Sequence, residues 1–340
     1  MTRRESGRTR ICATQKASFH SCVQMTNGSL QREGAAPRRR LGRVLVTGAN
    51  GFIGAALVDR LRHDGEEVVA SDLERGGAAS ARFQGCDITD PRQVETLFAH
   101  GPFETIFHSG AVSGPMVMPD RPLEIWRINA LGTAHLLEAG RRHRAGRFIL
   151  CSSCSIYGEM DGATINEATP PDPLGVYGAS KVAAEQAMIG FAREYGVDAI
   201  ALRLAWVYGP GRRTPTTLAQ LLQAATAGRA FVIDDAPSTV THYVHVEDVI
   251  EGLLGAAWAR NLPRLVYNIS AGPGARFDDL AALVCQLASG VAVTFARGEN
   301  ANTGPLRFDL ANAARDLGYR PSISLKDGLE RYLAALRTSA

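Results

Sequence analysis

Three residues in the middle of the chain have side chains suited to moving a proton at a hydroxyl group. Tyr177 and Lys181 are four residues apart in VYGASKVAAEQ (176–186), which is one turn of the helix that we expect there. A free tyrosine has a pKa of about 10 and is a poor base at neutral pH, but a neighbouring cation lowers that value. Ser153 ends the expected strand RFILCSS (147–153), where its hydroxyl could hydrogen-bond a substrate oxygen. Tyr177 could then act as the base.

Two cysteines flank this serine and suggest a different chemistry. The spacing Cys151-x-x-Cys154 is that of a zinc pair or a redox-active thiol pair. A zinc site needs further ligands at suitable spacing, and none is evident. A thioredoxin-like pair would open a helix, whereas Cys151 lies within an expected strand. His242-x-x-His245 is a second pair with metal-ligand spacing. Because further ligands are not evident for either pair, we expect no metal site and place the chemistry on Ser153.

A glycine-rich turn near residue 50 predicts a dinucleotide site. In VTGANGFIGAAL (46–57), Gly48, Gly51 and Gly54 lie between an expected strand and an expected helix. Such glycines permit a tight turn, a close approach to a pyrophosphate and close helix packing, while the helix N-terminus offers free N–H donors. Asp72 ends the next strand, where a carboxylate accepts ribose hydroxyls and repels a 2′-phosphate. The pattern favours NAD over NADP, with Arg75 keeping NADP as the alternative.

The two predicted sites fit one reaction. An oxidised nicotinamide is positively charged and would lower the pKa of Tyr177 further. Tyr177 could therefore remove a hydroxyl proton while a hydride leaves the same carbon. Asp87 ends the third expected strand and could meet the adenine of the same cofactor, or it could be a plain turn residue.

Alternating strands and helices are expected to position these residues. The expected strands are 43–47, 67–72, 81–87, 105–109, 147–153 and 199–204, and the expected helices are 53–65, 91–99, 122–141 and 176–195. This alternation predicts βαβ units and an α/β fold with a doubly wound parallel (Rossmann) sheet. We expect residues 41–205 to form the NAD-binding domain. Residues 206–340 should form mainly a smaller C-terminal α/β substrate lobe, with the chain crossing between the lobes.

The first 40 residues differ from the rest in composition. They carry nine basic residues against two acidic ones, a net charge of +7 in a whole-chain total of +3, so the other 300 residues sum to −4. Without hydrophobic periodicity, residues 1–40 predict a disordered basic extension. The alternatives are an organellar transit peptide and a true translation start at Met25.

Composition also excludes some classes of partner. A negative folded part argues against nucleic-acid binding, and no window is apolar enough for a membrane span. Six cysteines in a chain with no export signal indicate free thiols in a reducing, cytoplasmic location.

These motifs resemble the extended short-chain dehydrogenase/reductase family, in particular its NAD-dependent sugar epimerase and dehydratase branch, over roughly residues 43–337. The resemblance rests on TGANGFIG, HSGAVSG (108–114), NALGTAHLLEA (129–139), SSCSIYG, YGASK, LRLAWVYGPG (202–211), YVHVEDV (243–249) and ARDLGYRPSISLKDGLERYL. It implies that Ser153, Tyr177 and Lys181 are catalytic and that the chain forms a homodimer. The residues implied to bind NAD are Gly48, Asn50, Gly51, Phe52, Ile53, Gly54, Asp72, Asp87, Ile88, Ser109, Gly110, Ala111, Asn129, Tyr177 and Lys181.

A few positions depart from that family's pattern. Its dehydratases carry Asp-Glu directly after the catalytic serine or threonine, and this chain has Cys154 and Ser155 there, so dehydration is not expected. Its nucleotide-sugar epimerases place an Arg on the substrate pyrophosphate and an Asn nearby, where this chain has Thr241 and Trp206. A threonine cannot replace the bidentate phosphate contact of an arginine.

Other residues could bind the substrate instead. Arg212, Arg213 and Arg307 could grip a diphosphate or a sugar carboxylate, or they could be solvated loop charges. The substrate-binding residues that we predict are Ser113, Ser155, Trp206, Arg212 and His245.

Three functions remain open at this point. The first is a sugar epimerase, with a nucleotide sugar as the expected substrate, which oxidises a carbinol carbon, retains NADH and returns the hydride to the opposite face. The second is an NAD-dependent dehydrogenase of a free sugar or sugar acid that releases NADH. The third is a catalytically inactive NAD-binding regulator, which the intact Ser-Tyr-Lys set disfavours.

Overall fold

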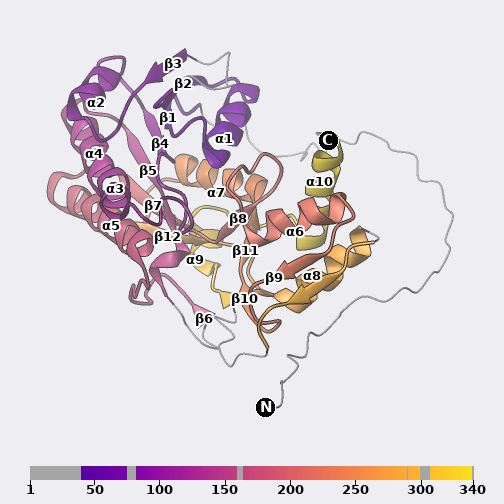
Figure 1. The fold of residues 1–340 in the computed structure, drawn as a ribbon. Coiled ribbons are helices and arrows are strands. Elements are labelled where there is room, and N and C mark those ends of the chain that lie inside the picture. The colour runs from indigo at the N-terminus through magenta and orange to yellow at the C-terminus, as the bar shows by residue number, and fades with distance from the viewer. Residues whose placement is uncertain (1–39, 75–81, 159–163, 289, 299–306, 339–340) are drawn as a thin grey trace.

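A parallel sheet of seven strands forms the centre of the computed structural model, which describes residues 40–74, 82–158, 164–288, 290–298 and 307–338 (Figure 1). The strand order is β12-β7-β5-β4-β1-β2-β3. Its strands are β1 (Arg43–Thr47), β2 (Glu67–Asp72), β3 (Arg82–Gly85), β4 (Thr105–His108), β5 (Arg147–Ser153), β7 (Ala199–Leu204) and β12 (Val266–Ile269). The order runs outward in both directions from β1 and β4, so the sheet is doubly wound and its switch point lies between these two strands.

Helices cover both faces of this sheet. One face carries α2 (Pro91–Phe98), α4 (Gly132–Arg142) and α5 (Val176–Tyr195), with α3 (Pro122–Trp126) packed against α5. The other face carries α1 (Phe52–His63) and α7 (Val246–Trp258), and α9 (Ala311–Asp316) packs on β12. Covering both faces explains why the central strands read as continuous apolar runs rather than alternating ones.

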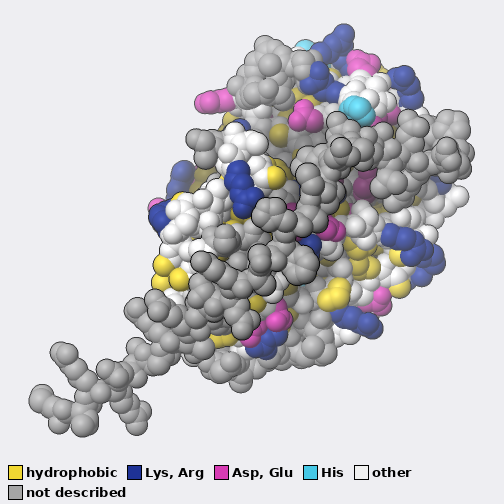
Figure 2. All heavy atoms as spheres, turned by 90° about the vertical axis from the view of Figure 1, so that its right-hand side faces the viewer, with side chains coloured by type: hydrophobic (Ala, Val, Ile, Leu, Met, Phe, Trp, Pro, Cys, Tyr) yellow, Lys and Arg dark blue, Asp and Glu magenta, His cyan; other side chains and the backbone are white. Residues whose placement is uncertain are grey.

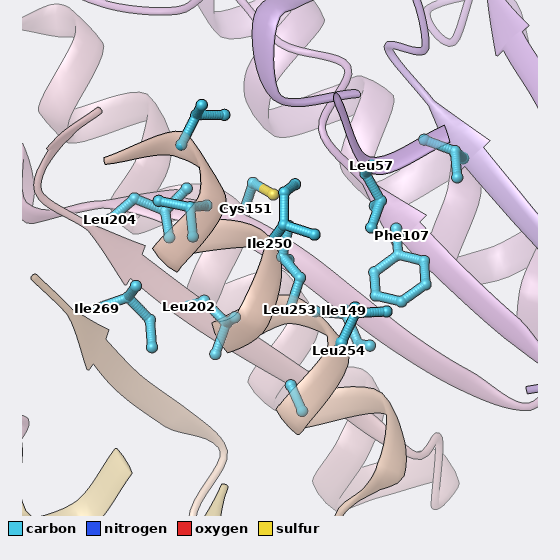
Figure 3. Packing of buried hydrophobic residues seen from close by; sticks show 14 of the residues in the cluster. Leu57, Phe107, Ile149, Cys151, Leu202, Leu204, Ile250, Leu253, Leu254 and Ile269 are labelled. Atoms are coloured by element: carbon cyan, nitrogen blue, oxygen red, sulfur yellow. The ribbon is translucent and has the colours of Figure 1, made fainter. Parts of the chain in front are cut away.

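Close packing of aliphatic side chains holds α7 to the sheet. Ile250, Leu253 and Leu254 on α7 lie over Ile149 of β5 and Leu202 of β7 (Figure 3). All five are at most 3% exposed. Burying side chains of this size contributes about 1.5–3 kcal/mol each, so helix α7 is firmly seated even though it follows a long passage through the second lobe.

The smaller lobe is built from helices and two-stranded sheets after residue 205. Its helices are α6 (Thr217–Thr226), α8 (Phe277–Leu287) and α10 (Leu325–Thr338), which share one buried cluster. Its strands are β8 (Trp206–Tyr208), β9 (Phe231–Ile233), β10 (Val240–Thr241), β11 (Tyr243–His245), β13 (Ala275–Arg276) and β14 (Val293–Phe295), paired β8 with β11, β9 with β14 and β10 with β13. A further pair joins β6 (Thr164–Ile165) to β15 (Arg307–Phe308). The lobe therefore combines helices with small sheets.

The structure confirms the predicted doubly wound α/β sheet and adds two features that the prediction did not specify. The expected helix over 122–141 is three segments, because a π-helical turn, η1 (Arg127–Leu131), joins α3 to α4. The seventh strand, β12, comes from residues 266–269 and pairs with β7. Chain far beyond residue 205 thus completes the central sheet. The predicted extension, apart from Arg40, and Arg75 lie outside the described residues.

Charges on the described surface are mixed. On the face shown in Figure 2, Lys and Arg side chains are interspersed with Asp and Glu side chains instead of forming one basic stripe. Within the described ranges, no helix has both the length and the apolar character needed to cross a membrane.

Candidate active site

A cavity of about 990 Å³ lies at the carboxyl ends of the central strands and continues toward the second lobe. Ligands of open parallel sheets bind at this edge, beside the switch point. Many predicted site residues line it: Asn50, Gly51, Phe52, Ile53, Ser109, Ser113, Ser153, Ser155, Tyr177, Lys181, Trp206 and Arg212. Residues up to 162 positions apart in the chain therefore share one cavity.

The glycine loop is shaped so that side chains would not fit. Gly48 has φ +70°, and a Cβ atom there would lie 2.4 Å from the amide nitrogen of Gly110. A Cβ at Gly54 would lie 2.0 Å from the carbonyl oxygen of Gly48. Helix α1 follows directly, and its N-cap residue Gly51 has no side chain to occupy the free N–H groups. These donors are available to an anion, as a dinucleotide pyrophosphate site requires.

Asp72 holds the loop from the end of β2. Its carboxylate accepts a hydrogen bond from the backbone N–H of Asn50 at 2.9 Å, and a second from that of Leu73 at 2.8 Å. A carboxylate has about four lone-pair positions, so two backbone donors leave room for ribose hydroxyls. The residues present therefore fit a dinucleotide.

Other predicted cofactor residues have structural partners near this loop. Asp87 accepts hydrogen bonds from the N–H and hydroxyl of Thr89, at 2.9 and 2.7 Å, as a turn residue does. Ser109 donates its hydroxyl to the carbonyl of Thr47 at 2.8 Å. The residues that line the cavity do not include the predicted cofactor residues Gly48, Gly54, Asp72, Asp87, Ile88, Gly110, Ala111 and Asn129.

Ser153 and Tyr177 meet inside the cavity. The Ser153 hydroxyl accepts from the N–H of Ser155 at 3.1 Å and lies 3.1 Å from the Ser155 hydroxyl. The phenol of Tyr177, the second residue of α5, lines the same cavity and lies close enough for Ser153 to influence its pKa. Burial raises the pKa of Tyr177, while Ser153 and the positive charge of Arg212 act in the opposite direction. The structure thus brings the predicted base and hydroxyl together.

Lys181 is directed at the strand. Its Nζ donates to the carbonyl oxygen of Cys151 at 3.0 Å, and the residue is 4% exposed. Burial lowers the pKa of this ammonium to about 8, with Cys151 and Glu185 acting in the opposite direction. The positive charge of Arg212 favours the Tyr177 phenolate in this arrangement.

A chain of hydrogen bonds runs from η1 to the start of α5. Asn129 lies in the π-helical turn, and its side-chain oxygen accepts from the N–H of Val112 at 2.8 Å. Its amide group donates to the Ser180 hydroxyl at 2.9 Å, and that hydroxyl donates to the carbonyl of Tyr177 at 2.7 Å. The contacts of Asn129 are buried and that of Ser180 with Tyr177 is part-buried, so the first turn of α5 is fixed in place.

Arg212 is the half-buried cation on the second-lobe side. Its Nη1 donates to the carbonyl of Val207 at 2.6 Å, and its guanidinium carbon lies 5.7 Å from the centre of the Phe52 ring. Its buried Nε has no hydrogen-bond partner among the described residues. The exposed Arg213 also lines the cavity, whereas Arg307 is exposed on β15 and does not.

Trp206 and Thr241, the two positions that depart from the epimerase pattern, line the same cavity as Ser153. Trp206 is 38% exposed and lines the cavity with Thr241. Next to them lie His242 and Phe308, whose rings meet edge to face at 4.8 Å. Sequence reasoning missed the last two residues as cavity lining, because their closeness depends on the pairing of β15 with β6.

His245 is not brought to the cavity. It is fully buried, and its Nδ1 accepts from the N–H of Glu247 at 3.3 Å, so it caps α7. Its ring packs edge-on against Tyr208 at 5.3 Å. The sequence prediction that it binds substrate is therefore not supported, because its ring is enclosed between these elements.

The paired cysteines and histidines are not arranged as metal ligands. Among the described residues, no group of three or more His, Cys, Asp or Glu side chains could hold a metal ion. Burial raises the pKa of Cys151 to about 12 and that of Cys154 further. The Cys154 thiol donates to the carbonyl of Arg203 at 3.3 Å. Both thiols are therefore held as neutral groups.

Comparison with known proteins agrees with this geometry. Residues 44–270 match the model of the NAD-dependent epimerase/dehydratase family, and the chain belongs to this family. It is an NAD-dependent enzyme of the extended short-chain dehydrogenase/reductase type.

Several relatives have established names. The chain is 30% identical to UDP-glucose 4-epimerase of Mycolicibacterium smegmatis, over 88% of this chain and 99% of that protein. The structure resembles UDP-glucose 4-epimerase of Thermotoga maritima with UDP-glucose (TM-score 0.79, 29% identity, 87% of this chain and 99% of that one). It also resembles MoeE5 in complex with UDP-glucuronic acid and NAD (TM-score 0.80, 30% identity, 88% and 100%). Relatives also include a dTDP-glucose 4,6-dehydratase of Actinoplanes, at 26% identity over 87% of this chain and 98% of that protein.

Proposed function

We propose that the protein is a nucleotide-sugar epimerase that inverts a carbinol carbon by oxidising it and then reducing it from the other face. The observation that carries this proposal is that Ser153 and Tyr177 line the same cavity as the N-terminus of α1, with Ser153 close enough to lower the pKa of the phenol. A proton-transfer pair and a dinucleotide site thus open into one space. The names of the relatives favour C4 of the sugar as the carbon and a UDP-sugar as the substrate.

The reaction divides between cofactor and protein. Held by the glycine loop and Asp72, NAD supplies reversible hydride transfer. Tyr177 removes the proton of the carbinol hydroxyl and later returns it to the same oxygen. Ser153 hydrogen-bonds that oxygen throughout. Lys181 and Asn129 hold the strand end and the first turn of α5, which keeps the phenol in reach.

The residues that follow Ser153 favour inversion over dehydration. Elimination of water would need an acid and a base beside Ser153. The neutral Cys154 thiol and the Ser155 hydroxyl supply neither, which favours epimerisation over dehydration.

The diphosphate contact is proposed to come from Arg212. Thr241 cannot bind a phosphate bidentately, and Arg212 has an unpartnered Nε beside the cavity. Trp206 and Phe308 would then pack against the sugar nucleotide, with Ser113 and Ser155 as hydrogen-bonding groups.

The presence of Thr241 and Trp206 in the cavity lining favours a second candidate, a dehydrogenase of a free sugar acid. Replacement of a diphosphate clamp by Thr241 is what a smaller anionic substrate would permit, with Arg212 binding its carboxylate. This enzyme would release NADH, whereas an epimerase retains it.

One experiment separates these functions. The purified protein is incubated with NAD and either UDP-glucose, UDP-glucuronic acid, dTDP-glucose or the free sugar acids, while proton NMR and the absorbance at 340 nm are followed. We expect a new anomeric signal from one UDP-sugar with no accumulating absorbance at 340 nm. Stoichiometric NADH from a sugar acid would establish the dehydrogenase instead. Turnover of none of these compounds would contradict both proposals.

The family resemblance also suggests an assembly and a location. On that resemblance we propose a homodimer in the cytoplasm. We also propose that residues 41–205 mainly bind NAD and residues 206–340 mainly bind substrate. Light scattering after size exclusion would give the mass of the assembly.

A further inference from the structure

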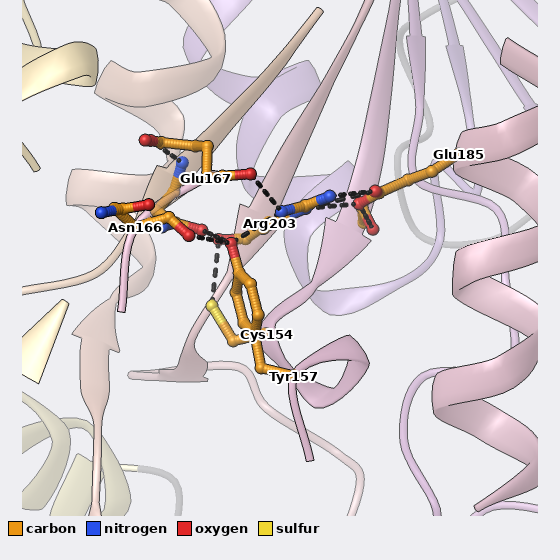
Figure 4. A network of polar contacts seen from close by, with 8 residues as sticks. Cys154, Tyr157, Asn166, Glu167, Glu185 and Arg203 are labelled. Atoms are coloured by element: carbon orange, nitrogen blue, oxygen red, sulfur yellow. Dashed lines mark hydrogen bonds and ion pairs between the residues drawn. The ribbon is translucent and has the colours of Figure 1, made fainter. Parts of the chain in front are cut away.

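A buried ion pair lies directly behind the strand end that bears Ser153. Arg203 of β7 and Glu185 of α5 are 4% and 0% exposed. Two guanidinium nitrogens of Arg203 reach the carboxylate, with the shortest contact at 2.7 Å. Figure 4 shows Arg203 between Glu185 on one side and Tyr157 with Glu167 on the other. This ion pair was not predicted from the sequence.

The carboxylate of Glu185 and the backbone of Arg203 accept hydrogen bonds from the residues on either side of Ser153. The Ser152 hydroxyl donates to Glu185 Oε1 at 2.5 Å. On the other side, the Cys154 thiol donates to the backbone carbonyl of Arg203 at 3.3 Å. The carbonyl of Cys151, one residue further back, accepts from Lys181 at 3.0 Å. Residues 151–154 all line the cavity, and residues 151, 152 and 154 are in addition hydrogen-bonded to the protein interior.

The far side of the pair is anchored as well. Arg203 Nη1 donates to the Tyr157 hydroxyl at 2.7 Å, and that hydroxyl donates to Asn268 of β12 at 2.8 Å. The N–H of Asn268 in turn donates to Glu167 at 2.9 Å. The guanidinium therefore cannot shift without moving strands β7 and β12 and the segment around Glu167.

From these contacts we infer that Glu185 and Arg203, acting through Ser152 and Cys154, are positioning residues that fix the hydroxyl of Ser153 toward Tyr177. A buried ion pair adds little net stability when compared with apolar residues of similar shape, so its retention is better explained by specificity of structure. We call Glu185, Arg203 and the residues hydrogen-bonded to them the frame behind Ser153. Cys154, which follows Ser153, has a role here because its thiol donates a hydrogen bond to this frame. This inference rests on the proposed function of Ser153.

The test uses small changes, because removal of either charge would leave its partner buried alone and could unfold the protein. Ser152→Ala removes one hydroxyl and keeps the ion pair, and Ser152→Thr restores the hydroxyl. We expect Ser152→Ala to lower kcat about tenfold with KM for the nucleotide sugar within twofold, since loss of alignment acts on the chemical step. Ser152→Thr should recover most of kcat. Cys154→Ala and Cys154→Ser form a second such pair.

A control separates positioning from general weakening of the fold. Thr105 is a buried hydroxyl at the opposite end of the sheet, where it donates to the carbonyl of Leu41 at 3.1 Å. Thr105→Val removes a comparable hydrogen bond, and we expect it to lower Tm without lowering kcat. If Thr105→Val and Ser152→Ala lose activity in proportion to Tm, the positioning role is overturned.

A second readout does not depend on turnover. In crystals of the NAD complex of the double variant Ser152→Ala/Cys154→Ala, the Ser153 side chain should occupy more than one rotamer. In the unaltered protein, Ser153 should occupy a single rotamer that directs its hydroxyl toward Tyr177. A single, unchanged rotamer in the double variant would overturn the inference. Should the unaltered protein turn over no nucleotide sugar, the proposed function fails, and these crystals still decide whether the frame fixes Ser153.

Discussion

The ammonium nitrogen of Lys181 lies 3.0 Å from the carbonyl oxygen of Cys151, so the helix that carries Tyr177 is hydrogen-bonded to the strand that ends at Ser153. The lysine is 4% exposed, and burial lowers its pKa from 10.5 to about 8. The protein therefore holds a positive charge in its interior at a free-energy cost.

Replacement of Lys181 by Met should make the protein more stable and inactive. At pH 7 the depressed pKa corresponds to about 3 kcal/mol of charge burial, offset by about 1 kcal/mol for the lost hydrogen bond. We therefore expect a net gain of about 2 kcal/mol in the free energy of unfolding. The gain should be full below pH 8 and shrink between pH 8 and 10.5, because over that range only the unfolded chain keeps the proton. Urea unfolding of both proteins at pH 7 and 9.5 measures it, and a less stable variant would contradict it.

Activity should fall as the pH rises through about 8. Lys181 is charged below this pH and neutral above it. Its hydrogen bond to the carbonyl of Cys151 is therefore charge-assisted only below about pH 8, and it weakens above that pH. A kcat/KM profile from pH 6 to 9.5 measures the alkaline limb. Lys181→Arg keeps its charge over this range, so its residual activity should show no such limb. A limb of equal position in Lys181→Arg would assign it to another group.

Gly54→Ala should abolish NAD binding. The new methyl group would lie 2.0 Å from the carbonyl oxygen of Gly48, which forces the loop open and displaces the N-terminus of α1. Gly190→Ala is the matched control, because a Cβ at this exposed position of α5 meets nothing within 4 Å. Alanine there should add up to about 1 kcal/mol of stability. Calorimetric titration with NAD compares the two, and unchanged affinity in Gly54→Ala would refute the loop assignment.

Arg212→Gln should weaken binding of a UDP-sugar about tenfold to a hundredfold, the effect of one charge-assisted hydrogen bond of about 1.5–3 kcal/mol. Arg213→Gln, a change at the exposed neighbour, should leave the affinity within twofold. Titrations with UDP and with NAD show which diphosphate Arg212 contacts. Thr241→Arg should tighten UDP binding, and equal affinities in Arg212→Gln and the unaltered protein would show that the anion lies elsewhere.

Tyr177→Phe should lower turnover by about 10²–10⁴, the usual contribution of an acid–base group, and Ser153→Ala should also reduce it. Neither change removes a group from the glycine loop, so NAD binding and Tm should stay close to those of the unaltered protein. Retained turnover in Tyr177→Phe would rule out the phenol as the base.

Local sequence patterns were sufficient for the elements that carry the cofactor and the catalytic group. The run RVLVT and the glycine spacing predicted β1 and α1 within one or two residues, because strand, turn and helix are set by neighbours in the chain. Tyr177 and Lys181 were predictable for the same reason, since four residues make one helical turn.

Local sequence patterns could not predict the contacts between segments that are distant in the chain. The ion pair between Arg203 and Glu185 joins a strand to a helix, with 18 positions between the two residues in the chain. The hydrophobic periodicity of these segments predicts which positions are buried, but it does not predict which buried residues contact each other. The motif containing His245 resembled a substrate segment, and only the path of α7 shows that its ring is enclosed. The direction of the Lys181 side chain likewise follows from how closely α5 lies on β5.

Strand β12 makes the two halves of this enzyme inseparable. It enters the central sheet beside β7 after the chain has passed through the other lobe and helix α7, and its Asn268 is linked through the hydroxyl of Tyr157 to Arg203. A fragment that stops at residue 205 would expose the edge of β7 and release the frame behind Ser153. The cofactor half is therefore not a portable module for chimeric enzymes. Any hybrid made from this chain has to inherit β12 together with the strands it completes.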